Sequence, residues 1–327
     1  MLNRARRAPA RGQGWPGVQI LNVLAPVFLM IAIGVLMQGC RFVSPDFLKE
    51  ANRVTYWLGL PALLFSQLVG SFHDVGGARL MLGGMLAATV LTVFAGYVLA
   101  WALRAPGGVA GTFVQGGFRG NLAFVGLPIV FSLPDTPLVW GVTLRTAAVL
   151  TLAPMLVFAN VVGVVVLLIS QHSLGWRMLK PLGRQLATTP PLLATVAGII
   201  FALAGWTLPP AIDKTFSALG EMALPLGLLG VGGSLVTVKL GGNWRLPLAS
   251  ALVKTAVSPL LGWAVCRWLG LGGAELKIVL IFMACPTAVI SYTMALELKG
   301  DEALASGTIV LSVLTSLVAL AVVVGVF

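Results

Sequence analysis

The sequence is poor in charge. Only 9% of its 327 residues are Asp, Glu, Lys or Arg, whereas a soluble domain has about 25%. Hydrophobic residues make up 58% of the chain, and the mean hydropathy is +0.99. A soluble globule cannot hide that much apolar surface, because its own surface must face water. The composition therefore excludes a soluble enzyme, a nucleic-acid-binding domain and a disordered chain, and it indicates a polytopic protein of the lipid bilayer.

Motifs for metal binding, redox chemistry and hydrolysis are also missing. The three cysteines, Cys40, Cys266 and Cys285, lie far apart and form no C-x-x-C pair, so neither a disulfide framework nor a zinc site is indicated. No G-x-x-x-x-G-K-[ST], H-E-x-x-H or G-x-S-x-G sequence occurs, which argues against an ATP-driven pump and an intramembrane hydrolase. We therefore expect no enzyme, no metal and no cofactor.

Long apolar runs dominate what is present. A membrane-spanning helix needs about 20 apolar residues, and the runs show no alternation typical of barrel strands. Prolines interrupt the second, fourth and ninth runs, at Pro61, Pro128 and Pro286. The sequence predicts ten membrane-spanning helices, at 18–38, 51–70, 79–103, 112–133, 138–169, 190–207, 216–237, 246–269, 276–297 and 303–327.

Residues 1–17 differ from the rest, since they are basic and rich in glycine and proline. They predict a disordered N-terminal tail before a retained first helix. Two alternatives stay open. The segment could be the start of a signal peptide, or the natural chain could begin near Val18.

The net charge of +11 lies mainly between the apolar runs, so it indicates membrane topology and no nucleic-acid partner. Loops that follow odd-numbered helices hold ten Lys and Arg residues, and the other interhelical loops hold four. Since Lys and Arg favour the cytoplasmic side, the termini are predicted on the non-cytoplasmic side of the cell (inner) membrane. The tail adds four arginines to the opposite count and is discounted here.

An internal repeat relates the two halves of the chain. The sequence GLPALLFSQLVGS begins at Gly59, and ALPLGLLGVGGS begins at Ala223. Each half places a proline in its second and its fourth predicted helix. Because each half has an odd number of helices, the second half must insert upside down, as in many secondary transporters. The predicted units are a first repeat at 18–170, a cytoplasmic loop at 171–189 and a second repeat at 190–327.

Two segments, Gly120–Pro128 and Ala284–Thr287, predict breaks between half-helices. Pro128 has no amide hydrogen, so the carbonyl of Phe124 loses its helical partner. If the breaks face each other, half-helix N-termini point at a shared midplane site that suits an anion. A plain proline kink is the alternative. The candidate substrate-binding residues are Asn121, Gly126, Pro128, Cys285, Pro286 and Thr287.

Charged residues inside the predicted spans are functional candidates. Arg145, Glu221 and Lys254 are assigned a coupling or charge role, with an interfacial position as the alternative for each. Arg119 is expected nearer the interface, where its side chain could reach the headgroups. The Gly-rich stretch 230–233 predicts close helix packing and no phosphate binding.

These motifs together resemble the auxin efflux carrier family. The fourth helix carries the motif from Phe118 to Pro128. The seventh helix has Ala223-Leu224-Pro225-Leu226 followed by Gly233-Ser234-Leu235, and the ninth has Ala284-Cys285-Pro286-Thr287-Ala288. The resemblance implies two inverted five-helix repeats, a scaffold domain, and a transport domain whose broken fourth and ninth helices cross. It also implies central-site roles for Asn121, Pro128 and Pro286. The short segment 170–189 favours the bacterial type of this family.

Members of that family carry auxin in plants and malate, malonate or related carboxylates in bacteria. The sequence therefore predicts a secondary transporter of small organic anions that works by alternating access. It predicts efflux, because the predicted spans hold no acidic pair for ion coupling. One alternative is a sodium-coupled symporter similar to the bile-acid carriers. Another is a non-transporting membrane receptor or enzyme. The expected partners are the anion, the bilayer and a second copy of the chain in a homodimer.

Overall fold

The structure is a computed structural model, and it describes residues 16–69, 76–138, 141–171, 190–237 and 244–327. Within these ranges the chain is helical, with two isolated β-bridges and no β-strand. In this part of the chain, six helices are long and apolar enough to cross a membrane, namely Ile20–Gly39, Ala78–Ala102, Leu144–Ser170, Pro210–Val236, Arg245–Trp268 and Glu302–Val326. The prediction of an all-helical polytopic membrane protein is therefore confirmed. The predicted tail and the predicted cytoplasmic loop lie almost wholly outside the described residues.

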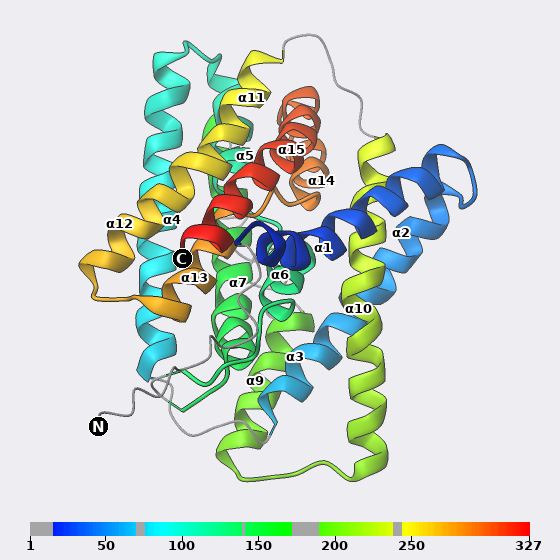
Figure 1. The fold of residues 1–327 in the computed structure, drawn as a ribbon. Coiled ribbons are helices and arrows are strands. Elements are labelled where there is room, and N and C mark those ends of the chain that lie inside the picture. Colours follow the sequence, from blue (N-terminus) through cyan, green and yellow to red (C-terminus); the bar gives the residue numbers. More distant parts are fainter. Residues whose placement is uncertain (1–15, 70–75, 139–140, 172–189, 238–243) are drawn as a thin grey trace, which may run out of the picture.

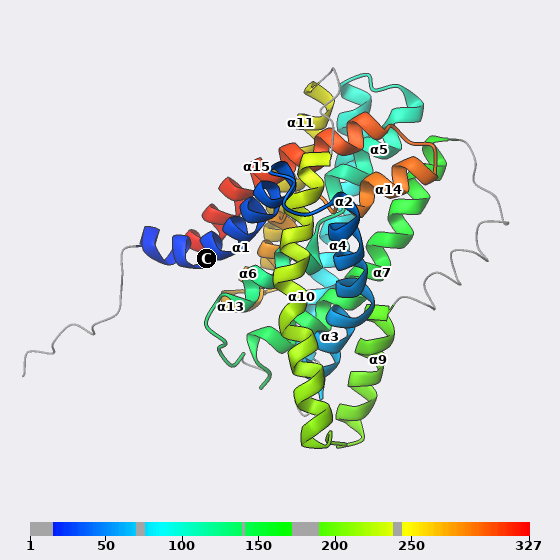
Figure 2. The same ribbon diagram turned by 90° about the vertical axis from the view of Figure 1, so that its right-hand side faces the viewer.

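The helices gather into two bundles that lie side by side (Figures 1 and 2). The first bundle comprises α1 (Pro16–Gly39), α2 (Pro45–Val54), η1 (Thr55–Gly59), α3 (Leu60–Leu68), α9 (Pro190–Leu203) and α10 (Pro210–Thr237). Helix α10 is its centre, because it packs against α1, α2 and α3, while α3 also packs against α9.

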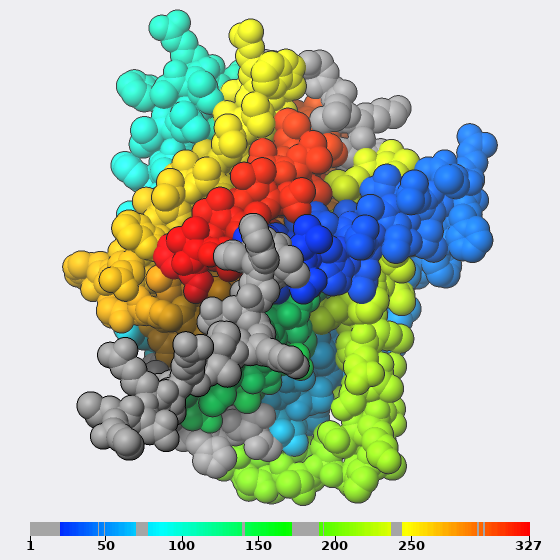
Figure 3. Space-filling model, in the orientation of Figure 1, coloured from blue at the N-terminus to red at the C-terminus, as the bar shows by residue number. Residues whose placement is uncertain are grey.

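The second bundle holds the remaining helices. They are α4 (Gly76–Ala102), α5 (Gly107–Phe118), η2 (Leu122–Gly126), α6 (Leu127–Phe131), α7 (Leu144–Ser170), α11 (Arg245–Leu252), η4 (Val253–Val257), α12 (Ser258–Trp268), α13 (Gly273–Ala284), α14 (Ile290–Glu297) and α15 (Glu302–Val326). Helix α15 lies along α11 on the face shown in Figure 3, and α12 packs against α4 and α13. The bundles meet where α1 contacts α15 and where α3 and α9 contact α7. Each bundle therefore combines segments from both halves of the chain.

Three turns of π-helix, η1, η2 and η4, each end two residues before a proline. A proline lacks the amide hydrogen that the carbonyl four residues earlier would accept in an α-helix. The chain closes a wider turn instead, in which an amide donates to the carbonyl five residues earlier. These bonds join Leu60 N to Thr55 O, Leu127 N to Leu122 O and Ser258 N to Val253 O.

Helix α10 approaches α1 and α2 through glycines. A Cβ atom built on Gly232 would lie 1.9 Å from the carbonyl oxygen of Ile31 in α1, and one on Gly233 would lie 2.1 Å from Leu48 Cδ1 in α2. Position 232 has no room for a side chain because it meets backbone, so the close contact of α10 with α1 requires glycine there, whereas at position 233 the Leu48 side chain would have to move. The predicted role of this stretch in helix packing is confirmed.

This contact predicts the effect of Gly232→Ala. The added methyl group meets backbone, which cannot rotate away, so α1 and α10 must separate. Overpacking of this kind costs about 1–3 kcal/mol, and we expect a lower thermal unfolding midpoint for the purified protein in detergent. Gly83→Ala in α4 is the matched control, since nothing lies within 4 Å of a Cβ there. An equal midpoint for both variants would contradict the assigned contact.

Candidate functional site

Two broken helices cross in the second bundle. Helix α5 ends at Phe118 and η2 begins at Leu122, while α13 ends at Ala284 and α14 begins at Ile290. The two breaks run antiparallel and form one β-bridge between Gly120 and Thr287. Its hydrogen bonds run from Asn121 N to Pro286 O, at 2.7 Å, and from Ala288 N to Arg119 O, at 2.9 Å. Each break therefore pairs backbone groups that the other break leaves without a helical partner.

Neighbouring side chains hold the crossing in place. The amide of Thr287 donates to Ser312 Oγ of α15 at 2.9 Å, and its hydroxyl donates to the carbonyl of Gly116 in α5 at 2.8 Å. A Cβ atom on Gly120 would lie 2.8 Å from Lys254 Cε and 2.9 Å from Cys285 Sγ. The crossing is therefore packed too tightly for any residue but glycine at position 120.

Asn121 begins the half-helix that leaves the crossing. Its Oδ1 accepts a hydrogen bond from the amide of Phe124 at 3.3 Å, so it is the N-cap of η2. The side chain is 5% exposed and lines a cavity. Because the amide oxygen is occupied by the cap, the NH2 group is the part of Asn121 available to a ligand.

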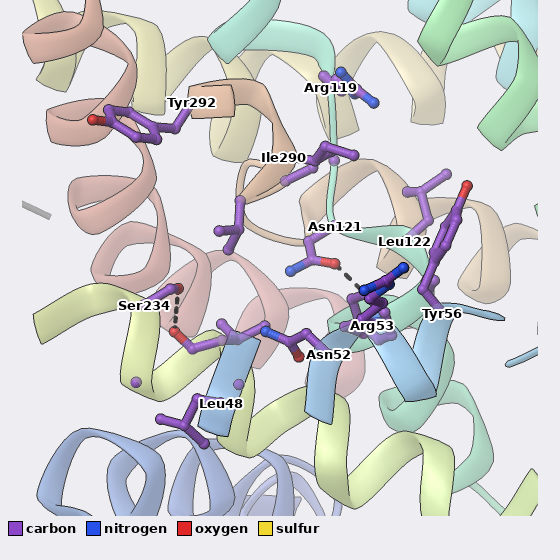
Figure 4. A pocket seen from close by; sticks show the side chains of 18 of the residues that line it. Leu48, Asn52, Arg53, Tyr56, Arg119, Asn121, Leu122, Ser234, Ile290 and Tyr292 are labelled. Atoms are coloured by element: carbon purple, nitrogen blue, oxygen red, sulfur yellow. Dashed lines mark hydrogen bonds between the residues drawn. The ribbon is translucent and has the colours of Figure 1, made fainter. Parts of the chain in front are cut away.

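The cavity has a volume of about 1010 Å³ and lies between the two bundles. The first bundle contributes residues of α1, α2, η1, α3 and α10. The second contributes the crossing itself together with η2, α7, α14 and α15. Figure 4 shows Asn121 and Leu122 from the crossing together with Asn52 and Tyr56 from the first bundle. A movement of one bundle against the other would therefore change the shape of this cavity.

Arg119 supplies a buried positive charge to the cavity wall. It is 4% exposed, and its guanidinium donates to Asn160 Oδ1 of α7 and contacts Met294 Sδ of α14. Arg119 forms no ion pair with a carboxylate among the side chains that the structure describes. The expectation that Arg119 reaches the membrane interface is wrong, because the break turns its side chain toward α7 and α14.

The amide oxygens of two side chains in the first bundle lack hydrogen-bond partners among the described residues, and both residues line the cavity. Gln38 Oε1 and Asn52 Oδ1 are buried and have no partner among the described residues. Asn52 lies directly over Gly230, where a Cβ atom would be 1.9 Å from its Oδ1. Buried polar groups normally have partners, so these two oxygens are suited to a ligand that brings hydrogen-bond donors.

The predicted substrate-binding residues occupy the crossing but differ in their access to the cavity. Asn121 lines the cavity. Cys285, Pro286 and Thr287 lie in the second break, where Cys285 Sγ donates to Phe282 O at 3.0 Å; they are not among the cavity-lining residues. Gly126 and Pro128 are also outside that set.

The break in the fourth predicted span lies earlier than Pro128. The chain leaves the helix at 119–121, whereas Gly126 and Pro128 lie in continuous helical structure. The π turn η2 accommodates Pro128, because Leu127 N bonds to Leu122 O. Gly126 instead permits close packing, since a Cβ there would lie 2.7 Å from the ring of Phe282.

The three charged candidates lie outside the cavity lining. Arg145, at the start of α7, donates to the carbonyl of Phe131 at 3.1 Å and so ties α7 to the end of α6. Glu221 is exposed on α10. Lys254 is 1% exposed and donates to the carbonyls of Phe282 and Met283 at the end of α13, so its interfacial alternative is wrong.

The sequence held further clues to the site. Asn160 interrupts the apolar run of α7 and could have been singled out on that ground alone. Gln38, Asn52 and Tyr56 lie in helices with many exposed residues, and only the packing shows that they face a cavity. No group of three His, Cys, Asp or Glu side chains that could hold a metal ion occurs among the described residues.

Comparisons with known proteins find similarity to transporters. The chain is 24% identical over 301 residues to an uncharacterized transporter of Methanothermobacter thermautotrophicus, covering 90% of this chain and 94% of that protein. It is 20% identical over 313 residues to an uncharacterized transporter of Methanocaldococcus jannaschii, covering 92% and 96%. Auxin efflux carrier component 8 of Arabidopsis thaliana is 24% identical over 140 residues, which are 41% of this chain and 38% of that protein.

A family model described as "membrane transport protein" matches residues 19–324. The match covers both bundles and the crossing. The chain therefore belongs to the membrane transport protein family, which is the auxin efflux carrier family that its motifs resemble.

Proposed function

We propose that the protein is a secondary transporter that exports small organic anions by alternating access. Its substrates are carboxylates such as malate, malonate or auxin-like acids. The observation that carries this proposal is the buried cation Arg119 in the wall of a cavity between two bundles, without a carboxylate partner among the described side chains. The membership of a transporter family supports transport over turnover.

An anionic substrate would supply the negative countercharge that Arg119 lacks. A buried charge is costly unless it is paired and hydrogen-bonded, and Asn160 gives Arg119 only a neutral acceptor. A planar guanidinium matches a carboxylate in shape and charge. Arg119 therefore favours an anion beside it, in a cavity that Asp46 and Glu302 also line.

The helix ends at the crossing favour the same ligand. The N-termini of η2 and α14 both begin at the crossing, and such ends carry about half a positive charge. The NH2 group of Asn121 adds a neutral donor. In transporters with broken helices, these features hold the carboxylate of the substrate near the middle of the membrane.

The far wall of the cavity indicates a substrate with polar groups at more than one end. Gln38 Oε1 and Asn52 Oδ1 are acceptors without partners among the described residues, so a hydroxyl or a protonated carboxyl of the substrate can donate to them. Asp46 and Arg53 also line this wall, and Arg53 lies 3.8 Å from Glu50. Small-molecule sites have volumes of about 300–1,000 Å³, so a cavity of about 1010 Å³ can hold a dicarboxylate or an aromatic acid.

The arrangement of the bundles supports different roles for them in transport. In this proposal the chain forms ten membrane segments in two inverted five-helix repeats, 18–170 and 190–327. The first bundle is the scaffold domain. The second bundle is the transport domain, which carries Arg119 and Asn121 past the scaffold. The protein lies in the cell membrane with both termini outside.

Membrane potential alone can drive export. A monoanion that leaves an inside-negative cell gains about 2.3 kcal/mol per 100 mV, which is a gradient of roughly forty-fold. Two other functions make different predictions. A sodium-coupled symporter requires sodium for flux, and a receptor or enzyme binds or converts its ligand without flux.

The proposal is tested by a flux screen in proteoliposomes with labelled mono- and dicarboxylates. We expect at least one carboxylate to move, and its movement to follow an imposed potential in the direction that suits an anion. Labelled neutral sugars and amines are the controls. Binding without any flux would favour the receptor or enzyme and end the proposal.

Arg119→Gln should weaken substrate binding. A hydrogen bond to a charged group is worth about 1.5–3 kcal/mol, so we expect the KM for the carboxylate to rise by about ten-fold or more. The measurement is concentration-dependent uptake. Arg145→Gln is the matched control, because Arg145 does not line the cavity; it should change stability more than KM. An unaltered KM in Arg119→Gln would remove the assigned role.

Asn121→Asp separates the cap from the binding donor. Aspartate is as good an N-cap as asparagine, so the thermal midpoint should hold. The variant replaces the NH2 donor with a second acceptor that repels an anion, and we expect uptake to fall by ten-fold or more. Asn121→Ala should lose a similar amount of uptake and some stability as well. Normal uptake by Asn121→Asp would show that the NH2 group contacts no carboxylate.

A further inference from the structure

Lys254 is a buried cation at the crossing and is not among the cavity-lining residues. It lies in the π turn η4, between α11 and α12, and is 1% exposed. Its Nζ donates to the carbonyls of Met283 and Phe282, the latter at 3.5 Å. Lys254 forms no ion pair with a carboxylate among the described side chains. Its charge is therefore balanced by backbone oxygens.

Those oxygens belong to the last turn of α13, which ends at Ala284 because the chain breaks there. The last four carbonyls of a helix have no partner within it, and together they carry about half a negative charge. A cation at this end is therefore favoured. In sodium-coupled transporters, a half-helix C-terminus with unwound carbonyls is a place where the coupling ion binds.

The aliphatic part of the Lys254 side chain lies against the bridge between the two breaks. A Cβ atom on Gly120 would lie 2.8 Å from Lys254 Cε and 2.9 Å from Cys285 Sγ. Gly120 is the residue before Asn121, and its bridge partner is Thr287. The Lys254 side chain is thus packed next to the backbone that positions the candidate site.

We propose that the Lys254 ammonium is a built-in cation that takes the place of a coupling sodium ion at the C-terminal end of α13. The carbonyls of Phe282 and Met283, which a sodium ion would use, already accept hydrogen bonds from Lys254. The positive charge that stabilises the crossing therefore belongs to a side chain of the protein and not to a bound ion. Substrate movement therefore requires no sodium. The transport part of this inference rests on the proposed function, whereas the ion requirement of the fold does not.

The test combines flux with thermal unfolding of the purified protein, in sodium chloride and in choline chloride. For the unaltered protein we expect both the carboxylate flux and the unfolding midpoint to be the same in the two salts. Lys254→Ala removes the charge and opens space at the carbonyls. In choline chloride its unfolding midpoint should be lower than that of the unaltered protein. In sodium chloride the midpoint should be at least about 3 °C higher than in choline, because sodium binds to the folded state of the variant. Its flux in choline should fall by about ten-fold or more.

Two variants make the result specific. Lys254→Met removes the charge but fills most of the space, so its loss of stability should not respond to sodium. Lys277→Met is the matched control, because Lys277 also donates to a backbone carbonyl, that of Val324 at 3.5 Å, but lies near the start of α13, whereas the break follows its end. It should show no sodium response and near-normal flux.

Several results would overturn the inference. They are a sodium requirement of the unaltered protein in flux or in stability, a Lys254→Ala variant that behaves like Lys277→Met, and an equal sodium response of Lys254→Ala and Lys254→Met. If Lys254→Ala fails to fold, the unfolding midpoints of the unaltered protein and of Lys254→Met in the two salts still test the inference. A higher midpoint in sodium than in choline for either protein would overturn it. If the unaltered protein moves no carboxylate, the proposed function fails while the unfolding measurements still test the cation.

Discussion

The rest of the structure depends on one pair of backbone hydrogen bonds, between Asn121 N and Pro286 O and between Ala288 N and Arg119 O. Polar backbone groups at membrane depth have no water to bind, so a break in one helix must find partners elsewhere. Here a second break supplies them. Gly120 and Thr287 face each other because each segment completes the hydrogen bonding of the other. The ends of α5 and α13 and the starts of η2 and α14 are thereby held close together, and residues of η2 and α14 line the cavity.

The charges around this crossing follow from the same geometry. Arg119 and Lys254 both come from segments next to the bridge, and both are buried. Lys254 is balanced by the carbonyl end of α13, whereas Arg119 has the neutral acceptor Asn160 and an open cavity beside it. In the function proposed above, Lys254 therefore has a structural role, whereas Arg119 lies where a ligand can reach it.

Much of the fold could be predicted from the apolar runs, because run length and hydropathy determine which segments enter a membrane. The two breaks could also be located to within a few residues from glycine and proline. The position of the first break was harder, since a proline can be accommodated either by a break or by a π turn, and η2 takes the second course at Pro128. The cavity wall contributed by Gln38 and Asn52 could not be predicted, because it depends on how closely α10 packs against α1 and α2. For the same reason, the burial of Arg119 follows from the path of the break and not from the hydropathy of its neighbours.

The π turns also determine how this chain can be aligned with its relatives. Each such turn contains one residue more than an α-helical turn, and a single residue rotates all that follows by about 100°. In α2–α3 and α11–α12, the residues beyond η1 and η4 face their neighbours only because that extra residue is present. A homologue without Pro61 or Pro259 would keep the same faces inward only with a one-residue deletion nearby. Gaps of one position at these two places are therefore expected in a correct family alignment, and a gap-free alignment there would assign buried positions to the wrong side of the helix.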